Sequence, residues 1–151
     1  MNKVTIIIIA IMVYTNAIAQ KITTDKVPTK ASSAFKAKFP AAKQESWSIE
    51  SPGIYEVEFI NGAKTQSAEF DETGNWLETE TKMDFKHIPQ PVTQAFTKQF
   101  EGFNVQEANK VETPKANTTY EIVAVKGKDG YEIMFSAEGK MLKKNVEKVE
   151  K

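Results

Sequence analysis

The chain repeats its own residue pattern once. Apolar, aromatic and turn residues of the first half return in the same order roughly 60 positions later, and the spacing grows by only a few residues along the unit. The growth falls at residues 115–118, where a connection tolerates insertion. The matching positions include Phe35 with Phe96, Phe39 with Phe100, Tyr55-Glu56 with Tyr120-Glu121, and Phe70 with Phe135. The sequence therefore predicts two copies of one module, at residues 20–84 and 85–151.

Residues 1–19 are typical of a secretory signal peptide. Lys3 precedes an apolar run at residues 4–13, and Ala17-Ile18-Ala19 forms a cleavage site before Gln20. The run has roughly ten residues, whereas a membrane-spanning helix needs about 20. We interpret the segment as removed on export, which predicts a periplasmic or secreted protein without a stable membrane anchor. An uncleaved N-terminal membrane helix is the alternative.

Composition excludes several function classes. The sequence contains neither arginine nor cysteine, and its formal net charge is +0. Disulfides, thiolate metal sites and cysteine nucleophiles are therefore excluded. A balanced charge without arginine argues against a nucleic-acid partner. No catalytic constellation is present, so we expect a protein that is not an enzyme and has no cofactor and no metal.

Each module opens with a helical period and continues with a strand period. An apolar residue and a proline, Val27-Pro28 and Ile88-Pro89, precede each helix, because proline suits the first helical turn. Apolar residues then recur every four positions, which marks one buried helical face. These positions are Ala31, Phe35 and Phe39 in the first copy and Val92, Phe96 and Phe100 in the second.

Alternating apolar and polar residues after each helix predict strands joined by tight turns. In the first copy the strands fall around 47–49, 55–59, 68–70 and 76–82, and Asn61-Gly62 is a strong hairpin signal. The second copy repeats them, with clear strands at 120–125, 131–135 and 140–146. The predicted fold class is α+β: a tandem repeat of a helix plus a four-stranded antiparallel meander. One helix covers one sheet face, so the other face is exposed and is the largest feature available for binding.

These motifs resemble the PepSY-like family of beta-lactamase-inhibitor-like proteins, which Bacteroidetes export. The resemblance rests on the apolar-Pro helix start, the Trp47 strand, Tyr-Glu-Val-Glu-Phe at 55–59, Asn61-Gly62 and the Phe70–Glu80 segment. It covers the residues after the signal, although the second copy departs, with Asn109 where the first has Trp47. The resemblance implies the layout of the beta-lactamase inhibitor protein, in which a concave sheet is presented to an enzyme. It implies a periplasmic binding or inhibitory module without catalysis.

The candidate binding residues lie in the acidic strands of the first copy. Glu56 and Glu58 form one acidic pair, and Glu78 and Glu80 form another. The two members of each pair are two residues apart and so share a face of their strand, which suits a basic partner or a divalent cation. A solvated strand face that discourages aggregation is the alternative. Trp76 has the same parity as the second pair and is the fifth candidate, although a bulge near the turn would bury it. The candidates are Glu56, Glu58, Trp76, Glu78 and Glu80.

Three function classes follow. The first is a binding module for an envelope or secreted protein, with inhibition of an enzyme as its finer form. The second is a periplasmic protein that binds a small ligand or a cation. The third, hydrolysis by paired carboxylates, requires two such groups in one cleft with one kept protonated by burial. His87, the single histidine, is interpreted as a linker residue, and the Asp71–Asn75 turn lacks the ligand spacing of a calcium loop.

Overall fold

The computed structural model describes residues 20–115 and 117–147 as one antiparallel sheet with two α-helices. Nine strands pair in chain order from β1 to β9. The predicted signal peptide lies outside the described residues. Within them, no helix is both long and apolar enough to span a membrane.

Each α-helix is preceded by a short 3-10 turn and followed by four strands. The first half has η1 (Thr24–Lys26), α1 (Thr29–Lys38), β2 (Ala42–Ser51), β3 (Ile54–Asn61), β4 (Lys64–Asp71) and β5 (Trp76–Lys82). The second half has η2 (Phe85–His87), α2 (Gln90–Gln99), β6 (Asn104–Glu112), β7 (Thr118–Lys126), β8 (Asp129–Ser136) and β9 (Met141–Glu147). A three-residue strand that the sequence did not indicate, β1 (Gln20–Ile22), pairs with β2.

The two halves are joined by strand pairing between β5 and β6. Four residue pairs make this connection, from Thr79 opposite Glu112 to Lys82 opposite Asn109. The remaining strands pair with their neighbours in sequence. The sheet is therefore continuous, a point that the residue pattern alone left open.

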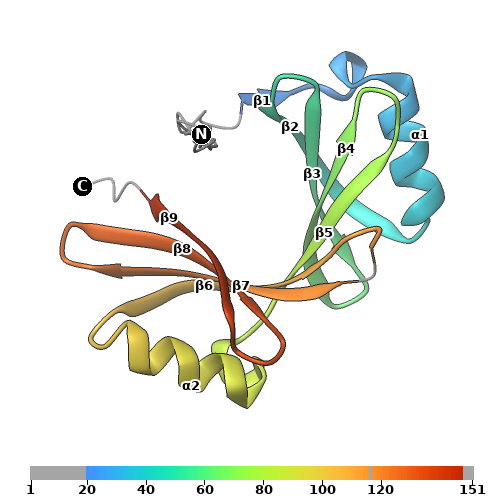
Figure 1. Ribbon diagram of the computed structural model, residues 1–151. Helices are drawn as coiled ribbons and strands as arrows, with labels where there is room; N and C mark the ends of the chain where they lie inside the picture. The colour runs from blue at the N-terminus through green and yellow to red at the C-terminus, as the bar shows by residue number, and fades with distance from the viewer. Residues whose placement is uncertain (1–19, 116, 148–151) are drawn as a thin grey trace, which may run out of the picture.

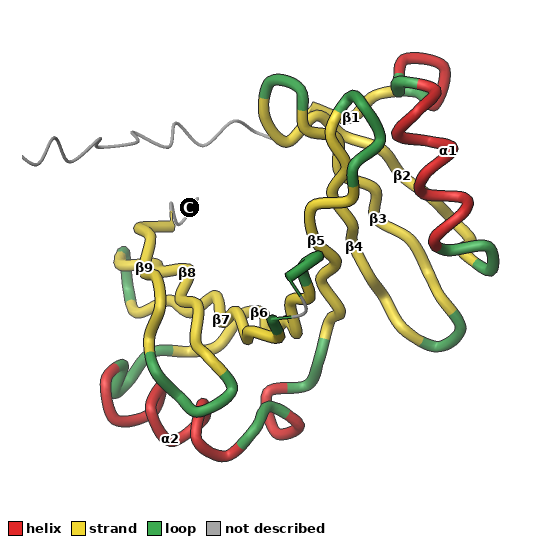
Figure 2. Tube along the Cα trace, turned by 45° about the vertical axis from the view of Figure 1, so that its right-hand side comes forward, coloured by secondary structure: helices red, strands yellow, loops and turns green. Residues whose placement is uncertain are grey.

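Both α-helices lie on the same side of this sheet (Figures 1 and 2). Residues directly opposite each other on neighbouring strands point to the same face. Thr81 pairs with Lys110, which pairs with Tyr120, and Tyr120 packs against the α2 core. Thr79, two residues from Thr81, pairs with Ala68 of the α1 core. The sheet bends at the β5–β6 junction with both helices outside the bend, so its other side is a concave face without a helix (Figure 2).

A separate hydrophobic core lies under each helix, and the helical faces match the prediction. Ala31 and Phe35 of α1 are buried against strands β2 to β4, and Val92 and Phe96 of α2 against β6 to β8. Phe35 makes edge-to-face contacts with three aromatic rings, at centroid distances of 5.0–6.3 Å, which are favourable aromatic geometries. Trp47 is buried in the first core, as its shared parity with Ile49 indicates.

The pairing registers correct one detail of the internal alignment. Trp47 pairs with Val57, and Tyr55 with Phe70. In the second half Tyr120 pairs with Phe135, as Tyr55 pairs with Phe70, so Ile122 is the equivalent of Val57. Ile122 pairs with Ala108. Ala108 therefore occupies the position of Trp47, whereas Asn109 corresponds to Ser48 and lies on the concave face. The sequence alignment was one residue out in this strand because Gln106-Glu107 resembles Gln44-Glu45 at a spacing of 62, whereas the registers keep the spacing of 61 that relates the two helices.

The turn before the last strand of each half packs against the first turn of its helix. Gly74 has φ +88°, and a Cβ there would lie 2.8 Å from the carbonyl oxygen of Lys30. Gly139 has φ +82°, and its Cβ would lie 2.3 Å from the carbonyl oxygen of Pro91. Only glycine combines this left-handed backbone with such a close approach.

We expect Gly139→Ala to destabilise the protein by more than Gly53→Ala does. The two glycines have the same φ of +82°, but a Cβ at Gly53 meets nothing within 4 Å. Gly53→Ala therefore reports the backbone strain alone, about 1–3 kcal/mol, and Gly139→Ala adds the clash. Urea unfolding of both variants measures the difference. Equal losses would show that the turn and α2 are not in contact.

Candidate functional site

The concave face is lined by glutamates from the first half. Strand parity places all four predicted glutamates there: Glu56 and Glu58 from β3, and Glu78 and Glu80 from β5. Glu69 of β4, which the sequence analysis did not single out, lies between them. Register places Glu69 directly opposite Glu56 on one side and Glu78 on the other. Three carboxyl groups thus form a row across adjacent strands, an arrangement that is destabilising when all are charged.

Burial in the bend keeps much of this row protonated near neutral pH. Desolvation is the main cause that raises the pKa of Glu56 from its ordinary value of 4.5 to about 7, and Glu50 and Glu58 add to it. The pKa of Glu69 rises likewise to about 7, first through burial and then through Glu78. Burial also raises the pKa of Glu78, and Lys143 of β9 partly offsets this effect. The charge of Lys143 on β9 therefore acts on Glu78 of β5 across the concave side.

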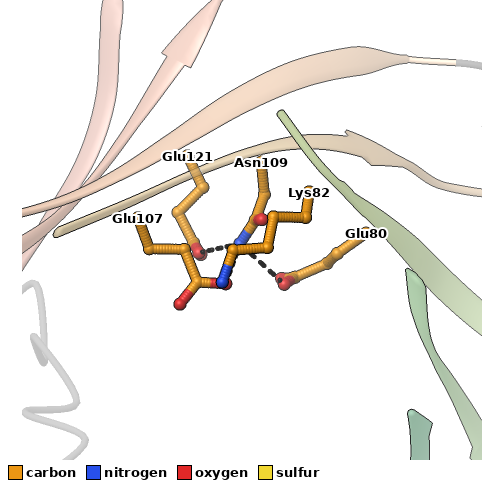
Figure 3. Close-up of polar contacts among 5 residues, drawn as sticks. All are labelled: Glu80, Lys82, Glu107, Asn109 and Glu121. Carbon is orange, nitrogen blue, oxygen red and sulfur yellow. Dashed lines mark hydrogen bonds and ion pairs between the residues drawn. The ribbon is translucent and has the colours of Figure 1, made fainter. Parts of the chain in front are cut away.

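A second group of polar side chains gathers at the β5–β6 junction (Figure 3). Asn109, only 4% exposed, directs its Nδ2 toward carboxylate oxygens from three strands. The distances from Nδ2 are 3.2 Å to Glu80, 3.3 Å to Glu107 and 3.3 Å to Glu121. Glu107 also lies 3.9 Å from Lys82 Nζ, an exposed ion pair of little energetic weight. The β5–β6 pairing brings together residues that are far apart in the sequence.

Two carboxyl groups of this junction, those of Glu80 and Glu121, have raised pKa values. An amide nitrogen carries two hydrogens, so Asn109 does not satisfy three ionised carboxylates at once. Burial, followed by the charge of Glu121, raises the pKa of Glu80. Burial and then Glu132 raise the pKa of Glu121, while the bond from Asn109 lowers it. A carboxyl group that keeps its proton also donates a hydrogen bond, which relieves the shortage of donors.

Trp76 does not belong to this face. A register shift between Glu69 and Phe70 of β4 places Trp76 opposite Phe70, on the side of the helices. Its ring lies 3.5 Å beneath Lys38 Nζ of α1, and its Nε1 donates to Thr79 Oγ1 at 2.9 Å. The bulge adds one residue at the start of β5, so the alternative given for Trp76 in the sequence analysis holds and its parity differs from that of Glu78 and Glu80. Four of the five predicted residues therefore share a face, and Trp76 packs against the first core instead.

The other candidate residues lie away from the concave glutamates or have local roles. His87 is exposed in η2. The Asp71 carboxylate accepts hydrogen bonds from backbone and side chain of Thr73 and Asn75, and these bonds lower its pKa to about 2. Asp71 thus closes its own turn. Over residues 20–115 and 117–147, no group of three or more His, Asp or Glu side chains has a geometry that would hold a metal ion.

Glu80 and Glu121 are the neighbouring carboxyl groups to compare with glycoside hydrolysis, the third function class. That reaction needs one protonated acid and one ionised carboxylate, whose environments push their pKa values apart. Glu80 and Glu121 share one environment and one amide donor, and burial raises the pKa of both.

The signals for Asn109, Glu107 and Glu121 were weak in the sequence. Tyr120-Glu121 repeats Tyr55-Glu56, so Glu121 could have been found as the equivalent of Glu56 on the same face. Asn109 was misplaced by one residue. Only the β5–β6 pairing puts Glu80 next to β6, and no local pattern indicates it.

The fold and this face define a class: proteins with two helices on one side of a bent antiparallel sheet and an open, polar face on the other. The chain belongs to the family described as "Putative beta-lactamase-inhibitor-like, PepSY-like", whose model matches residues 11–64 and 53–143. The resemblance drawn from the residues is confirmed. No curated protein is significantly similar to this chain in sequence.

Solved structures from Bacteroides share the fold. A BLIP-like protein from Bacteroides fragilis has a TM-score of 0.67 at 22% identity, over 81% of this chain and 87% of its own. A DUF2874 family protein from Bacteroides ovatus has a TM-score of 0.70 at 24% identity, over 79% and 86%. A Bacteroides eggerthii structure described as "putative periplasmic proteins" has a TM-score of 0.71 at 22% identity, over 80% and 88%.

We expect the protein to be more stable at pH 5 than at pH 8. Unfolded glutamates titrate near 4.5, whereas Glu56 and Glu69 titrate at about 7 when folded. Between these values the folded state binds more protons, so the free energy of unfolding falls as pH rises. The lowered pKa values of Asp71 and Asp84 act below this window. Calorimetry should give a Tm about 3–8 °C higher at pH 5. An equal or higher Tm at pH 8 would contradict the raised pKa values.

Glu80→Gln should raise the Tm at pH 8 and reduce the difference between the Tm at pH 5 and the Tm at pH 8. Glutamine keeps the size of Glu80 and an acceptor for Asn109 while removing the buried charge. Glu72→Gln, in an exposed turn, is the matched control and should leave both values unchanged. A lower Tm for Glu80→Gln at both pH values would mean that the ionised carboxylate stabilises the junction.

Proposed function

We propose that this protein is an exported binding module without catalytic activity, and that it engages an envelope or secreted protein through its concave face. The observation that carries the proposal is the continuous sheet itself: both helices cover one side, and the other side presents a bent, polar surface. Concave surfaces with a few convergent polar groups are where binding sites are usually found.

The charge on this face favours a partner with basic side chains. Glu58 is exposed, and Glu56, Glu69, Glu78 and Glu80 lie half-buried around it. A cationic group that enters the face would stabilise the ionised forms of these carboxyls, so binding would release protons. The affinity for such a partner should therefore rise with pH between about 5 and 8.

Inhibition of an enzyme is the finer form of the proposal. It is supported by the family description, which names beta-lactamase-inhibitor-like proteins, and by the BLIP-like protein of Bacteroides fragilis. Since fold does not determine function, the partner enzyme has to be found by experiment. A periplasmic or secreted location is supported by the signal pattern at residues 1–19 and by the Bacteroides eggerthii relative.

We also propose that the concave face arose by joining two copies of one unit, residues 20–84 and 85–151. The same order of elements in both halves supports this, as does the shared register of Tyr55 with Phe70 and Tyr120 with Phe135. The copies differ on the concave side. Glu69 and Glu78 of the first correspond by register to Met134 and Lys143 of the second, so the acidic half and the other half present different chemistry.

The test is capture of partners from a periplasmic and membrane extract of the source organism, followed by direct binding measurements. The face variant carries Glu58→Lys and Lys82→Glu, two exposed positions on the concave side. The control variant carries Glu72→Lys and Lys36→Glu, in a turn and on α1, so its overall charge is the same. We expect the face variant to bind the captured protein at least about 10-fold more weakly, and the control variant to bind normally.

The outcomes separate the alternatives. Loss of the partner in the control variant alone would place the site on the helical side and contradict the proposal. If the captured protein is an enzyme, its activity in the presence of wild type and face variant decides whether binding inhibits it. If no protein is retained, a thermal-shift screen of small ligands and cations tests the second function class.

A further inference from the structure

The two halves of the sheet are joined by a short ladder. β5 pairs with β6 over four residue pairs, whereas β3 with β4 and β7 with β8 each have eight. One further backbone bond, from Met83 N to the carbonyl oxygen of Ala108 at 2.8 Å, extends the ladder. The hydrophobic cores under α1 and α2 have no residue in common. The pairing of β5 with β6 is therefore the main connection between the halves.

The paired residues of this ladder are mostly polar. Seven of the eight are polar or charged, and the exception is Val111, which is buried but is not part of either core cluster. The pairs also lie where β5 ends at Lys82 and where β6 ends at Glu112. Hinges are formed by a few residues at the ends of elements, whereas closely packed apolar cores resist deformation. The ladder is thus the place where the halves turn relative to each other most readily, and the sheet bends there (Figure 2).

Carboxyl groups from both halves meet on the inner side of this bend (Figure 3). Glu80 comes from the first half, and Glu107 and Glu121 come from the second. All three carboxyls lie 3.2–3.3 Å from one nitrogen atom, Asn109 Nδ2. Ionised carboxylates around one atom repel one another, and a single amide group has only two hydrogens to share among the three. The ladder that joins the halves is thus also the place where like charges from both halves are brought together.

We propose that the β5–β6 ladder is a hinge, and that ionisation of the carboxyl groups on its inner side widens the concave face. When these groups are protonated, each donates a hydrogen bond to a neighbouring oxygen, and the bend stays closed. When they lose their protons, these donors are lost and the remaining charges push the halves apart. Burial raises the pKa of Glu80 and of Glu121, so the widening takes place at neutral to alkaline pH and not near the ordinary value of 4.5.

The charges that face Glu80 and Glu121 determine the direction of the movement. Those of the first half are Glu56, Glu58, Glu69, Glu78 and Lys82, and those of the second half are Glu107, Glu132 and Lys143. Two interactions of lysines across the bend oppose the widening. Lys82 Nζ lies 3.9 Å from the Glu107 carboxylate, and the charge of Lys143 acts on Glu78. Each half nevertheless has an excess of acidic groups once the carboxyls are ionised, so repulsion between the halves exceeds attraction.

The inference concerns the regulation of the concave face, and its relevance to binding rests on the proposed function. A wider and more charged face would admit a basic partner more easily at high pH, in the same direction as the expected rise in affinity. The widening itself is a property of the protein alone and is measured without a partner. A protein that widens but captures no partner, or one that binds without widening, would therefore separate the two proposals.

The test measures the distance between the halves at two pH values. The chain contains no cysteine, so spin labels attached at Thr23→Cys and Lys128→Cys report on these positions alone. Both positions are exposed, one in each half. Double electron–electron resonance should show a longer mean distance between the labels at pH 9 than at pH 5. A second pair, Thr23→Cys with Thr65→Cys, lies within the first half and should keep its distance.

Matched variants separate the junction from other carboxyl groups. Glu80→Gln with Glu121→Gln keeps the size of both side chains and removes both charges, so it should remove at least about half of the shift in distance. Glu72→Gln with Glu138→Gln removes two charges from exposed turns, one in each half, and should leave the shift unchanged. The label pair within the first half, measured in the same variants, shows whether they remain folded.

Each outcome decides the proposal. A longer distance between the halves at pH 9 that depends on Glu80 and Glu121 supports it. The same distance at both pH values overturns it, and so does a shift that Glu80→Gln with Glu121→Gln leaves unchanged. An equal shift in the pair within the first half also overturns it, because the halves would then deform internally instead of turning at the ladder.

Discussion

The structure depends on the pairing of β5 with β6. These four residue pairs join the two halves of the chain in one sheet, and their register fixes both helices on the same side. Without this pairing each unit would present its own small sheet, and Glu80 would not meet Asn109. The bend at the junction reduces the exposure of residues on the concave side, although no helix covers them. Burial of polar groups on an otherwise open face is thus a direct result of how the halves are joined.

The concave face carries a cost in stability that the rest of the fold supports. Three glutamates lie directly opposite one another, and two more, Glu80 and Glu121, share the amide donor of Asn109 with Glu107. Each charged form is disfavoured by desolvation and by its neighbours, so the carboxyls hold protons that exposed glutamates would lose. Two aromatic-rich cores, one under each helix, supply the compensating stability. Such local disadvantages are typical of surfaces kept for function.

Much of the fold follows from the sequence, because helical and strand periods are local. The buried faces of α1 and α2 and the hairpins of each half were read from spacing, and the four acidic candidates share the predicted face. A bulge near the β4–β5 turn, the alternative given for Trp76, reverses the strand parity there and places the ring on the side of the helices. Asn109 was aligned with Trp47 because Gln106-Glu107 resembles Gln44-Glu45 one residue out of register. Glu121 could have been found as the repeat of Glu56, but only the non-local pairing of β5 with β6 brings Glu80 and Lys82 of the first half to the polar group around Asn109.

The central claim is that β5 and β6 pair in one register, and a cysteine cross-link tests it most directly. The chain contains no cysteine, so a pair introduced at Thr81 and Lys110 has no competitor. Directly opposite residues in an antiparallel pair have Cα atoms about 4.5–5.5 Å apart, within the range of a disulfide. The account predicts that Thr81→Cys with Lys110→Cys oxidises rapidly to an intramolecular disulfide in the folded protein, and that Thr81→Cys with Glu112→Cys does so much more slowly. Equal rates for the two pairs, or no cross-link in the first, would contradict a continuous sheet.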